Sequence, residues 1–367
     1  MKKRIFLWLV LSVIISGIIF WSLGCTGGSV VGESSDDNND APATTSVNLL
    51  QSAYIQLGAT DSLSTITRGG VNSLDVIIFA FGNIASSSID NSYLTWMQTF
   101  INHRNPNSVI FLSIGGETVR PEHITAAGGS SAIVTNIVAQ IHSYNNSLAG
   151  GSITGVDLDL ENAIDAATIN SLAKGFKDAG LIVCTAPQVY LSSGASVDPS
   201  NPTNMVLTSG GALATTNTYG TAISNGYVDY IMVQTYNSGG ITINGYAENN
   251  VQFFKAVSNA LNSSRGILSI PDHTKIFVGQ VANQCAGGQY NIFNPNLGWP
   301  FPVVYDQQAI LNQLKTDILS MESDSTNYGN ISGVMVWSLN NDYMPTGWSD
   351  TYATSGAFTR TIFGASD

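Results

Sequence analysis

The stretch ITGVDLDLE, residues 153–161, is the one on which the predicted fold depends most. From Val156 onwards, apolar side chains alternate with the acids Asp157, Asp159 and Glu161. Successive side chains on a strand point to opposite faces, so the three acids share one face and the apolar residues share the other. The apolar face is predicted to meet a layer of helices. The acids are then directed to an enclosed polar site on the opposite face.

Seven further apolar, β-branched runs extend along the chain, and segments of helical period separate most of them. Strands this apolar are typical of parallel sheets, which are buried on both faces. Asp165 and Ser130 are predicted to cap the N-termini of two helices, and Gly180 to end one. The further strands are predicted at 53–57, 75–81, 108–114, 181–188, 227–236, 275–282 and 331–339, and helices at 91–104, 130–145, 165–180, 247–263 and 307–322.

Polar or aromatic residues stand at the C-terminal tip of nearly every predicted strand. An open, doubly wound sheet would concentrate such groups at one switch point, and no G-x-G-x-x-G loop follows any strand. Groups spread over eight tips indicate a ring around one mouth, so the fold class is predicted to be a (β/α)8 TIM barrel. The tip residues are Gln56, Asn83, Ser113, Asp159, Glu161, Gln188, Gln234, Tyr236, Gln280, Trp337 and Asn340.

The N-terminal segment has the pattern of an export signal. Three basic residues, Lys2 to Arg4, precede an uncharged stretch from Ile5 to Gly24, and Cys25 follows. A basic region followed by an apolar one is typical of a secretory signal, and Gly24-Cys25 resembles a bacterial lipoprotein cleavage site. Plain secretion and an uncut membrane anchor are the alternatives, and in every case the body is exported. The predicted organisation is a signal peptide with a possible lipoprotein Cys at 1–25, a flexible linker at 26–46 and a catalytic barrel at 47–367.

Composition restricts the class of partner. The chain is 44% hydrophobic and 10% charged, with a formal net charge of −12. Its body has no Lys/Arg cluster, so we expect no nucleic-acid partner and membrane contact only through the N-terminal anchor. The spacing of Cys and His is not that of a metal site, and pairing between Cys184 and Cys285 stays open.

The three acids allow three interpretations. They are a structural cluster, a site for a divalent cation, or an acid–base pair for cleavage of a glycosidic bond. Same-face neighbours on a strand are about 6.5–7 Å apart, so their ionisation is coupled and at least one is predicted to be protonated. Acid–base catalysis is favoured, because unpaired buried charge is costly and one strand offers too few ligands for a cation. Two acids from the same strand approach a sugar from the same side, which leaves the opposite side without an obvious nucleophile unless the substrate supplies its own.

The stretch from Thr154 to Glu161 resembles the D-G-x-D-x-D-x-E signature of family 18 glycoside hydrolases, the chitinases and their relatives. The similarity extends over 47–367, in the style of plant class III and related bacterial chitinases. It includes Ser113–Gly116, Ala186–Gln188, Gln234–Asn237 and Val336–Ser338, at the tips of strands three, five, six and eight.

The resemblance implies a role for each catalytic residue. Glu161 corresponds to the proton donor to the glycosidic oxygen. Asp159 orients the 2-acetamido group and stabilises the positive charge that forms when its oxygen attacks C1. Asp157 shares a proton with Asp159, and the Tyr236 hydroxyl hydrogen-bonds the acetamido oxygen.

The resemblance also implies substrate-binding residues and an absence of cofactors. Gln234 lines the subsite where cleavage occurs, and Trp337 forms the floor on which the sugar stacks. Cis peptide bonds are expected after Trp337 and in the 79–81 region, and no metal or cofactor is expected. Further substrate-binding residues are predicted to be Gln188, Ser113, Gly116 and Asn237.

The chain departs from the family pattern in two places. Thr154 replaces the first Asp of the signature, and strand alternation turns it away from the acids, so it is expected to support the strand. Residues 283–330 hold only a loop and a helix where some family members carry a small α+β domain. The cleft is therefore predicted to be open, which favours cleavage within chains.

These observations predict an exported, monomeric, retaining hydrolase that cuts internally in β-1,4-linked N-acetylglucosamine polymers such as chitin, through an oxazolinium intermediate. An endo-β-N-acetylglucosaminidase acting on N-glycan cores would share the same acids. A chitin-binding barrel without activity is the alternative outside the enzymes.

Overall fold

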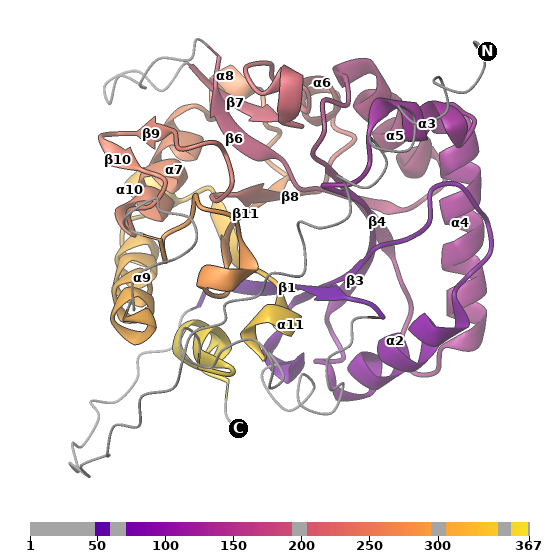
Figure 1. Ribbon diagram of the computed structural model, residues 1–367, viewed down its shortest axis with the longest axis horizontal. Helices are drawn as coiled ribbons and strands as arrows, with labels where there is room; N and C mark the ends of the chain where they lie inside the picture. The colour runs from indigo at the N-terminus through magenta and orange to yellow at the C-terminus, as the bar shows by residue number, and fades with distance from the viewer. Residues whose placement is uncertain (1–47, 59–70, 193–203, 295–305, 344–353, 366–367) are drawn as a thin grey trace, which may run out of the picture.

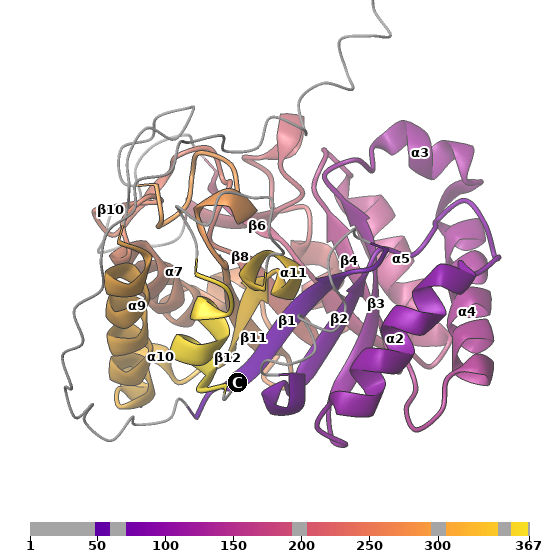
Figure 2. The same cartoon turned by 60° about the horizontal axis from the view of Figure 1, so that its bottom comes forward.

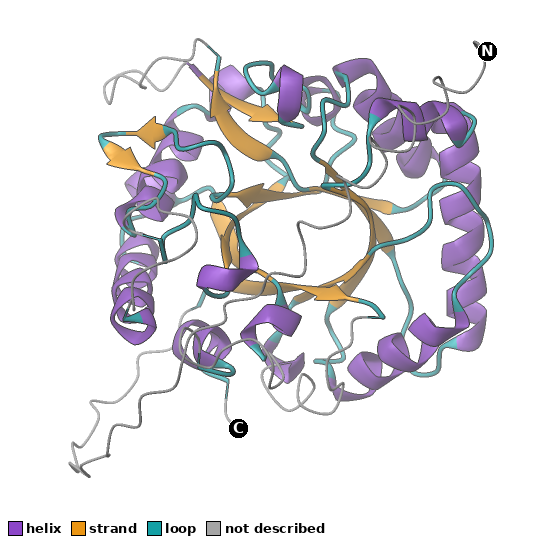
Figure 3. Ribbon diagram, in the orientation of Figure 1, coloured by secondary structure: helices purple, strands orange, loops and turns teal. Residues whose placement is uncertain are grey.

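Eight parallel strands close into a barrel in the computed structural model, which describes residues 48–58, 71–192, 204–294, 306–343 and 354–365. Figure 3 shows the strands as a ring with helices outside it. The order around the ring is β11-β12-β1-β2-β3-β4-β5-β8, and β8 pairs with β11 to close it. The predicted TIM barrel is confirmed. Its strands are β1 (Leu50–Gln56), β2 (Val76–Ala80), β3 (Val109–Gly116), β4 (Gly155–Leu160), β5 (Ile182–Thr185), β8 (Tyr230–Gln234), β11 (Lys275–Val281) and β12 (Ile331–Trp337).

Helices cover the outside of the barrel (Figure 1). Asp165 caps α5, because its carboxylate accepts a hydrogen bond from the Thr168 amide at 2.8 Å, and Gly180 follows the end of this helix with φ +80°. Ser130 is not an N-cap: α4 begins one residue earlier, at Gly129, after a left-handed Gly128. The helices are α2 (Asn91–His103), α3 (Pro121–Ala126), α4 (Gly129–Ser147), α5 (Ala166–Asp178), α6 (Gly220–Ser224), α7 (Gln252–Ser263), α8 (Arg265–Leu268), α9 (Gln307–Glu322), α10 (Ser325–Tyr328) and α11 (Leu339–Asp342), with short turns at η1 (Val71–Ser73), η3 (Gly211–Leu213), η4 (Gln284–Ala286) and η5 (Thr359–Phe363).

Two separate apolar clusters form the core. The larger one lies between strands and helices, and the smaller one fills the barrel with residues such as Tyr54, Phe111 and Met335. Large side chains inside the barrel face glycines on the neighbouring strand. Phe111 stands in register with Gly155, Phe277 with Gly333, and Met335 with Gly279. A Cβ at any of these three glycines would lie 2.2–2.5 Å from the nearest atom of the facing side chain, so only glycine fits there.

Two β-hairpins extend the loops at the carboxyl end of the barrel (Figure 2). The run predicted as one strand at 181–188 is two strands, β5 and β6, which Ala186 and Pro187 separate. Proline restricts the residue before it and lacks an amide hydrogen, so the ladder is interrupted there. The hairpins are β6 (Gln188–Leu191) with β7 (Met205–Thr208), and β9 (Thr242–Ile243) with β10 (Tyr246–Ala247).

The connection from β11 to β12 leaves the mouth without an added sheet. In its described residues, 282–294 and 306–330, it forms η4, α9 and α10 and no strand. Among the described helices, none has the length and apolar character needed to cross a membrane. The predicted signal peptide and linker, 1–25 and 26–46, lie outside the described residues.

Candidate active site

The acids of β4 point into the barrel, and the alternating apolar residues pack outside it. Asp157 and Asp159 are 0% and 3% exposed, and Glu161 follows the last residue of the strand and is partly exposed. Val156, Leu158 and Leu160 belong to the cluster under the helices. The predicted division of the strand into two faces is confirmed.

Asp157 lies deepest among the three acids. Its Oδ2 accepts hydrogen bonds from Tyr54 Oη at 2.9 Å and from Ser113 Oγ at 2.6 Å. Tyr54 comes from β1 and Ser113 from β3, so the carboxyl joins three strands. Burial raises the pKa of Asp157, and the hydrogen bonds from Ser113, Cys184 and Tyr54 oppose that rise.

Asp159 stands between Asp157 and Glu161. Its Oδ1 accepts a hydrogen bond from Gln234 Nε2 at 2.9 Å, and the same amide donates to the Ala186 carbonyl at 3.0 Å. Burial raises the pKa of Asp159 well above its ordinary value, and the charges of Glu161 and Asp157 raise it further. The shift favours the protonated form of Asp159, whose carboxyl is also hydrogen-bonded to Glu161.

Glu161 has the properties of a general acid. Burial and the nearby charge of Glu117 raise its pKa to about 7, and hydrogen bonds from Asp159, Gln234 and Gln188 limit the rise. The Gln188 amide donates to its Oε2 at 3.3 Å. A carboxyl with a pKa near the working pH is the group that transfers a proton most effectively. Sequence analysis did not assign Glu117 a role; it is an exposed residue directly after β3.

Tyr236 completes the polar group at the mouth. It lies two residues beyond β8 and is 4% exposed, and its pKa is raised well above the ordinary value by burial and by the charges of Asp159, Glu161 and Asp157. The hydroxyl is therefore protonated, and it lies close enough to the three acids for their charges to act on it. Asn237, the next residue, has φ +58° and an exposed side chain whose Oδ1 accepts from the Gly288 amide at 2.8 Å. Its predicted contact with substrate stays a prediction.

Aromatic rings stand across the mouth from the acids. Trp337 ends β12, which is separated from β4 by three strands in either direction around the ring. Its ring centroid lies 5.4 Å from that of Tyr54 and 6.1 Å from that of Phe81. Gly116 has φ +74°, and a Cβ there would lie 3.0 Å from the Phe81 ring. The peptide bonds Ala80–Phe81 and Trp337–Ser338 are cis, as expected from the resemblance.

Several of the predicted tip residues hold the framework. Gln56 and Asn340 bond to each other through backbone and side chain at 2.7 and 3.1 Å. The Gln280 amide donates to the Thr235 carbonyl at 2.9 Å. Thr154 is exposed at the start of β4 and donates to the Ile110 carbonyl, in keeping with its predicted support of the strand.

Two residues of the site were missed from the sequence. Tyr54 binds Asp157 from β1, and its alternation with Ala53 and Ile55 was the available signal for an inward side chain. Cys184 is an unpaired buried thiol beside Asp157, and burial raises its pKa well above the ordinary value. Tyr54 reaches Asp157 only when the ring closes, whereas Cys184 stands in register with Asp157 on the neighbouring strand β5.

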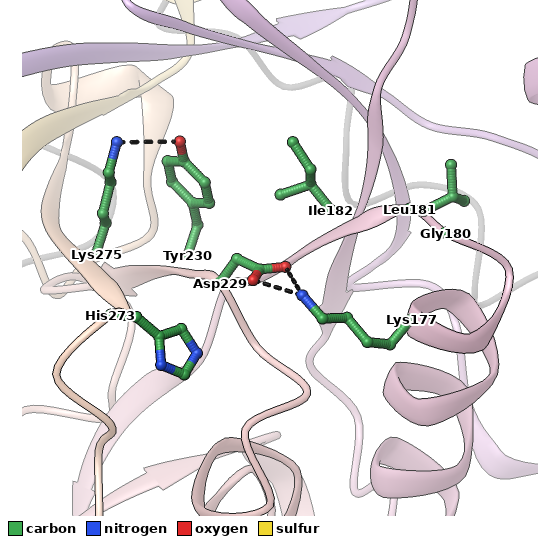
Figure 4. Close-up of a pocket in the computed structure, with 8 residues that line it drawn as sticks. All are labelled: Lys177, Gly180, Leu181, Ile182, Asp229, Tyr230, His273 and Lys275. Carbon is green, nitrogen blue, oxygen red and sulfur yellow. Dashed lines mark hydrogen bonds and ion pairs between the residues drawn. The ribbon is translucent and has the colours of Figure 1, made fainter.

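A separate pocket of about 440 Å³ lies at the amino end of the barrel (Figure 4). Three of its residues are at or near the first position of a strand: Ile182, Tyr230 and Lys275. Lys177 forms an ion pair there with Asp229 at 2.6 Å. The β4 acids lie at the other end of the strands, where active sites of TIM barrels are found. No group of three or more His, Cys, Asp or Glu in the described part of the chain is arranged to hold a metal ion.

Comparison with known proteins agrees with the fold. No family model matches the chain. A chitinase of Enterococcus faecalis is 27% identical over 257 residues, which are 64% of this chain and 60% of that protein, so the chain spans less than two thirds of this relative. Among solved structures, the GH18 chitinase ChiB of Flavobacterium johnsoniae has a TM-score of 0.52 at 15% identity, and covers 86% of this chain and 94% of its own. The spore cortex-lytic enzyme SleL of Bacillus cereus has a TM-score of 0.54 at 13% identity, and covers 88% of this chain and 75% of its own. The chain thus has a TIM barrel like those of these solved structures, and its sequence is similar to that of a chitinase.

Proposed function

We propose that the chain hydrolyses β-1,4-linked N-acetylglucosamine polymers, chitin first among them, and retains the anomeric configuration. The observation that carries the proposal is the position of Glu161. Its pKa of about 7 suits a proton donor, and its carboxyl partner, Asp159, comes from the same strand. Two-carboxylate glycosidases place their acids on opposite sides of the bond, so this arrangement leaves the second role to the substrate.

The first step follows from the positions of these groups. The Glu161 carboxyl gives its proton to the glycosidic oxygen while the 2-acetamido oxygen attacks C1. The bond from C1 to the leaving sugar breaks, and a cyclic oxazolinium ion forms. Its positive charge develops beside Asp159, which lowers the pKa of this residue and favours the ionised form. In the second step water attacks C1 from the side the leaving sugar vacated, and Glu161, now ionised, takes the proton from that water.

Tyr236 and Trp337 support the same assignment from two other strands. The Tyr236 hydroxyl faces the acids and is suited to donate to the acetamido oxygen, holding it for attack. Trp337 stands across the mouth, where an indole ring can stack on the apolar face of a sugar. The described residues between β11 and β12 add no wall to the cleft, which supports binding of long chains and cleavage at internal bonds.

The test compares the parent with Glu161→Gln on fluorogenic chitobiose and chitotriose glycosides. The parent is expected to release the fluorophore, and the variant to lose about 10³-fold in turnover while still binding oligosaccharide. Detection of the β-anomer as first product by NMR would show retention. Near-normal turnover in Glu161→Gln would overturn the assignment of the acid.

The choice of polymer needs its own measurement, because an enzyme named for lysis of the spore cortex shares the barrel. Chitin oligomers, a glycoprotein with N-glycans and isolated spore cortex are offered separately, and the products are analysed by mass spectrometry. Cleavage of chitin oligomers at internal bonds is expected. Release of glycans would instead indicate an endo-β-N-acetylglucosaminidase, and binding without cleavage would indicate a binding barrel.

We further propose that the protein is exported and held at the membrane through a lipidated Cys25, on the sequence pattern alone. The substitution Cys25→Ser in a bacterial host is expected to release the protein from the membrane fraction. Retention of this variant in the membrane would indicate an uncut anchor.

A further inference from the structure

Glu248 is a buried acid outside the β4 group. It directly follows β10 in the hairpin region after β8, and its side chain is 0% exposed. Oε1 accepts a hydrogen bond from the Ser238 amide at 2.5 Å, and Oε2 accepts one from the Gly240 amide at 2.8 Å. Both carboxylate oxygens are therefore used on one short segment, 238–240.

No cation balances this carboxyl among the described residues. The ion pairs among the described residues are Lys174–Asp178, Lys177–Asp229 and Arg265–Asp272, and none of them includes Glu248. Burial raises its pKa to about 7, and the amides of Ser238 and Gly240 oppose the rise. Burial of an acid without a counter-ion is unfavourable, and the hydrogen bonds that the carboxylate accepts offset this cost.

The segment that Glu248 holds adjoins Tyr236. Gly239 and Gly240 both have positive φ, +83° and +80°. In the unfolded chain these two glycines can adopt many other backbone conformations. One residue, Asn237, separates Tyr236 from this segment. The Asn237 amide donates to the Tyr290 carbonyl at 2.8 Å. The direction in which the chain leaves Tyr236 is thus determined by Glu248 and by the stretch around Tyr290.

Aromatic rings press on the same two glycines. A Cβ at Gly240 would lie 2.6 Å from the Tyr290 ring, and one at Gly239 would lie 3.6 Å from the Tyr190 ring. The segment therefore contacts two aromatic rings and is hydrogen-bonded to one carboxylate. The Ser238 hydroxyl and the Ile241 amide add to the hydrogen bonds that Glu248 accepts.

We propose that Glu248 is a positioning residue: its carboxylate holds residues 238–240 and thereby keeps the Tyr236 hydroxyl in place against Asp159 and Glu161. The inference rests on the proposed function, in which Tyr236 binds the acetamido oxygen, and adds to it the group that orients this tyrosine. Glu248 touches neither substrate nor reacting atoms in this scheme.

Glutamine is the informative substitution, because it has the same shape and half the acceptors. In Glu248→Gln the remaining side-chain oxygen still accepts a hydrogen bond from one backbone amide. The new NH2 group faces the other backbone amide, and because both groups are donors no hydrogen bond forms between them. Asp342→Asn is the matched control. Asp342 is also buried, and its carboxylate accepts from the amides of Phe358 and Thr359, both at 2.9 Å, so it holds the C-terminal turn η5 instead.

Two measurements on the full chain test the proposal. The first is hydrogen exchange of a peptide covering residues 236–241, which is expected to be at least about tenfold faster in Glu248→Gln and unchanged in Asp342→Asn. The second is a double-mutant cycle with Tyr236→Phe on the fluorogenic substrate. We expect Glu248→Gln to lower kcat about tenfold with little change in KM, and to have almost no effect when Tyr236 is already phenylalanine.

The outcomes separate this inference from the proposed function. Unchanged exchange in Glu248→Gln, or a rate loss that is the same in both tyrosine backgrounds, would overturn the role of Glu248, whereas Asp342→Asn is expected to show the same loss in both. An inactive parent would overturn the proposed function and with it the positioning role. Even then, the exchange result would still show whether Glu248 holds the loop.

Discussion

The two ends of the barrel place their carboxylates in opposite environments. At the amino end, Asp229 forms an ion pair with Lys177 at 2.6 Å (Figure 4). It also accepts a hydrogen bond from the Val183 amide at 2.9 Å, and its side chain is 21% exposed. At the carboxyl end, Asp157 and Asp159 are buried and Glu161 is partly exposed, and the three acids contact hydroxyls, amides, a thiol and one another. The acid at the amino end is paired with a cation, and no ion pair among the described residues includes the three acids.

The difference shows what the carboxyl end is built for. A partly exposed acid that is paired with a lysine adds modestly to stability. Acids buried without a cation have raised pKa values, so they hold protons that can be transferred near neutral pH. The acids at the mouth therefore lower the stability of the fold but are suited to acid–base chemistry. The ion pair at the amino end does not have this cost.

The largest effect is expected from exchanging one acid for an amide at each end. In the proposed mechanism Asp159 stabilises the oxazolinium ion, so Asp159→Asn should lower kcat about 10²–10³-fold. Asp229→Asn, the same change at the other end, should leave kcat within about twofold. Initial rates on the chitotriose glycoside measure both, and equal losses would mean that position in the barrel does not matter.

A smaller effect is expected on stability, with opposite sign to the loss of activity. Glu161 has a pKa of about 7 in the folded protein and a lower one in the unfolded chain, so the folded state binds the extra proton and is favoured at low pH. That stabilisation is complete below about pH 4 and is lost as pH rises through 7. Glu161→Gln removes the titration, and should be more stable than the parent by about 1–3 kcal/mol at pH 8 and no more stable at pH 4. Urea unfolding at the two pH values measures this difference, and equal gains at both would contradict a raised pKa.

The smallest effect is expected at the amino end. Lys177→Met removes the ion pair with Asp229 and keeps the apolar part of the side chain, so the free energy of unfolding should fall by about 1 kcal/mol or less. Activity should not change. Thermal unfolding and the glycoside assay measure the two quantities, and a large rate loss would show that the ends of the barrel are coupled.

Much of this contrast could be predicted from local sequence. The alternation of Val156 to Glu161 identified the acid face, and Asp165 and Gly180 marked the ends of a helix. Both depend on neighbours within a few residues. The cis bond at Trp337 was expected from resemblance and not from any physical property of the residues.

The remaining features depend on contacts across the closed ring. Tyr54 reaches Asp157 from a strand about 100 residues earlier, and Glu248 reaches a loop that no periodic pattern describes. Polar residues at strand tips were ambiguous for another reason: Gln280 binds a backbone carbonyl, whereas Gln234 binds Asp159, and nothing in their local sequence distinguishes the two. Ser130 was wrong as a cap because the glycines before it start the helix one residue earlier.

The glycines inside the barrel have a consequence for how sequences of this kind diverge. Gly155, Gly279 and Gly333 each face one large side chain on the adjacent strand, with no room for a methyl group between them. A change on either side alone is then unfavourable: a larger residue at Gly155 collides with Phe111, and a smaller one at 111 leaves a void. At Gly279 the two nearest atoms belong to the flexible end of Met335, so these two positions can change as a compensating pair. A Cβ at Gly155 or Gly333 would also lie 2.4 or 2.5 Å from the carbonyl oxygen of Ile182 or Leu50, so a smaller facing side chain would not make room for it. Among homologues, a residue larger than glycine at 279 should be accompanied by a smaller one at 335, whereas positions 155 and 333 should stay glycine.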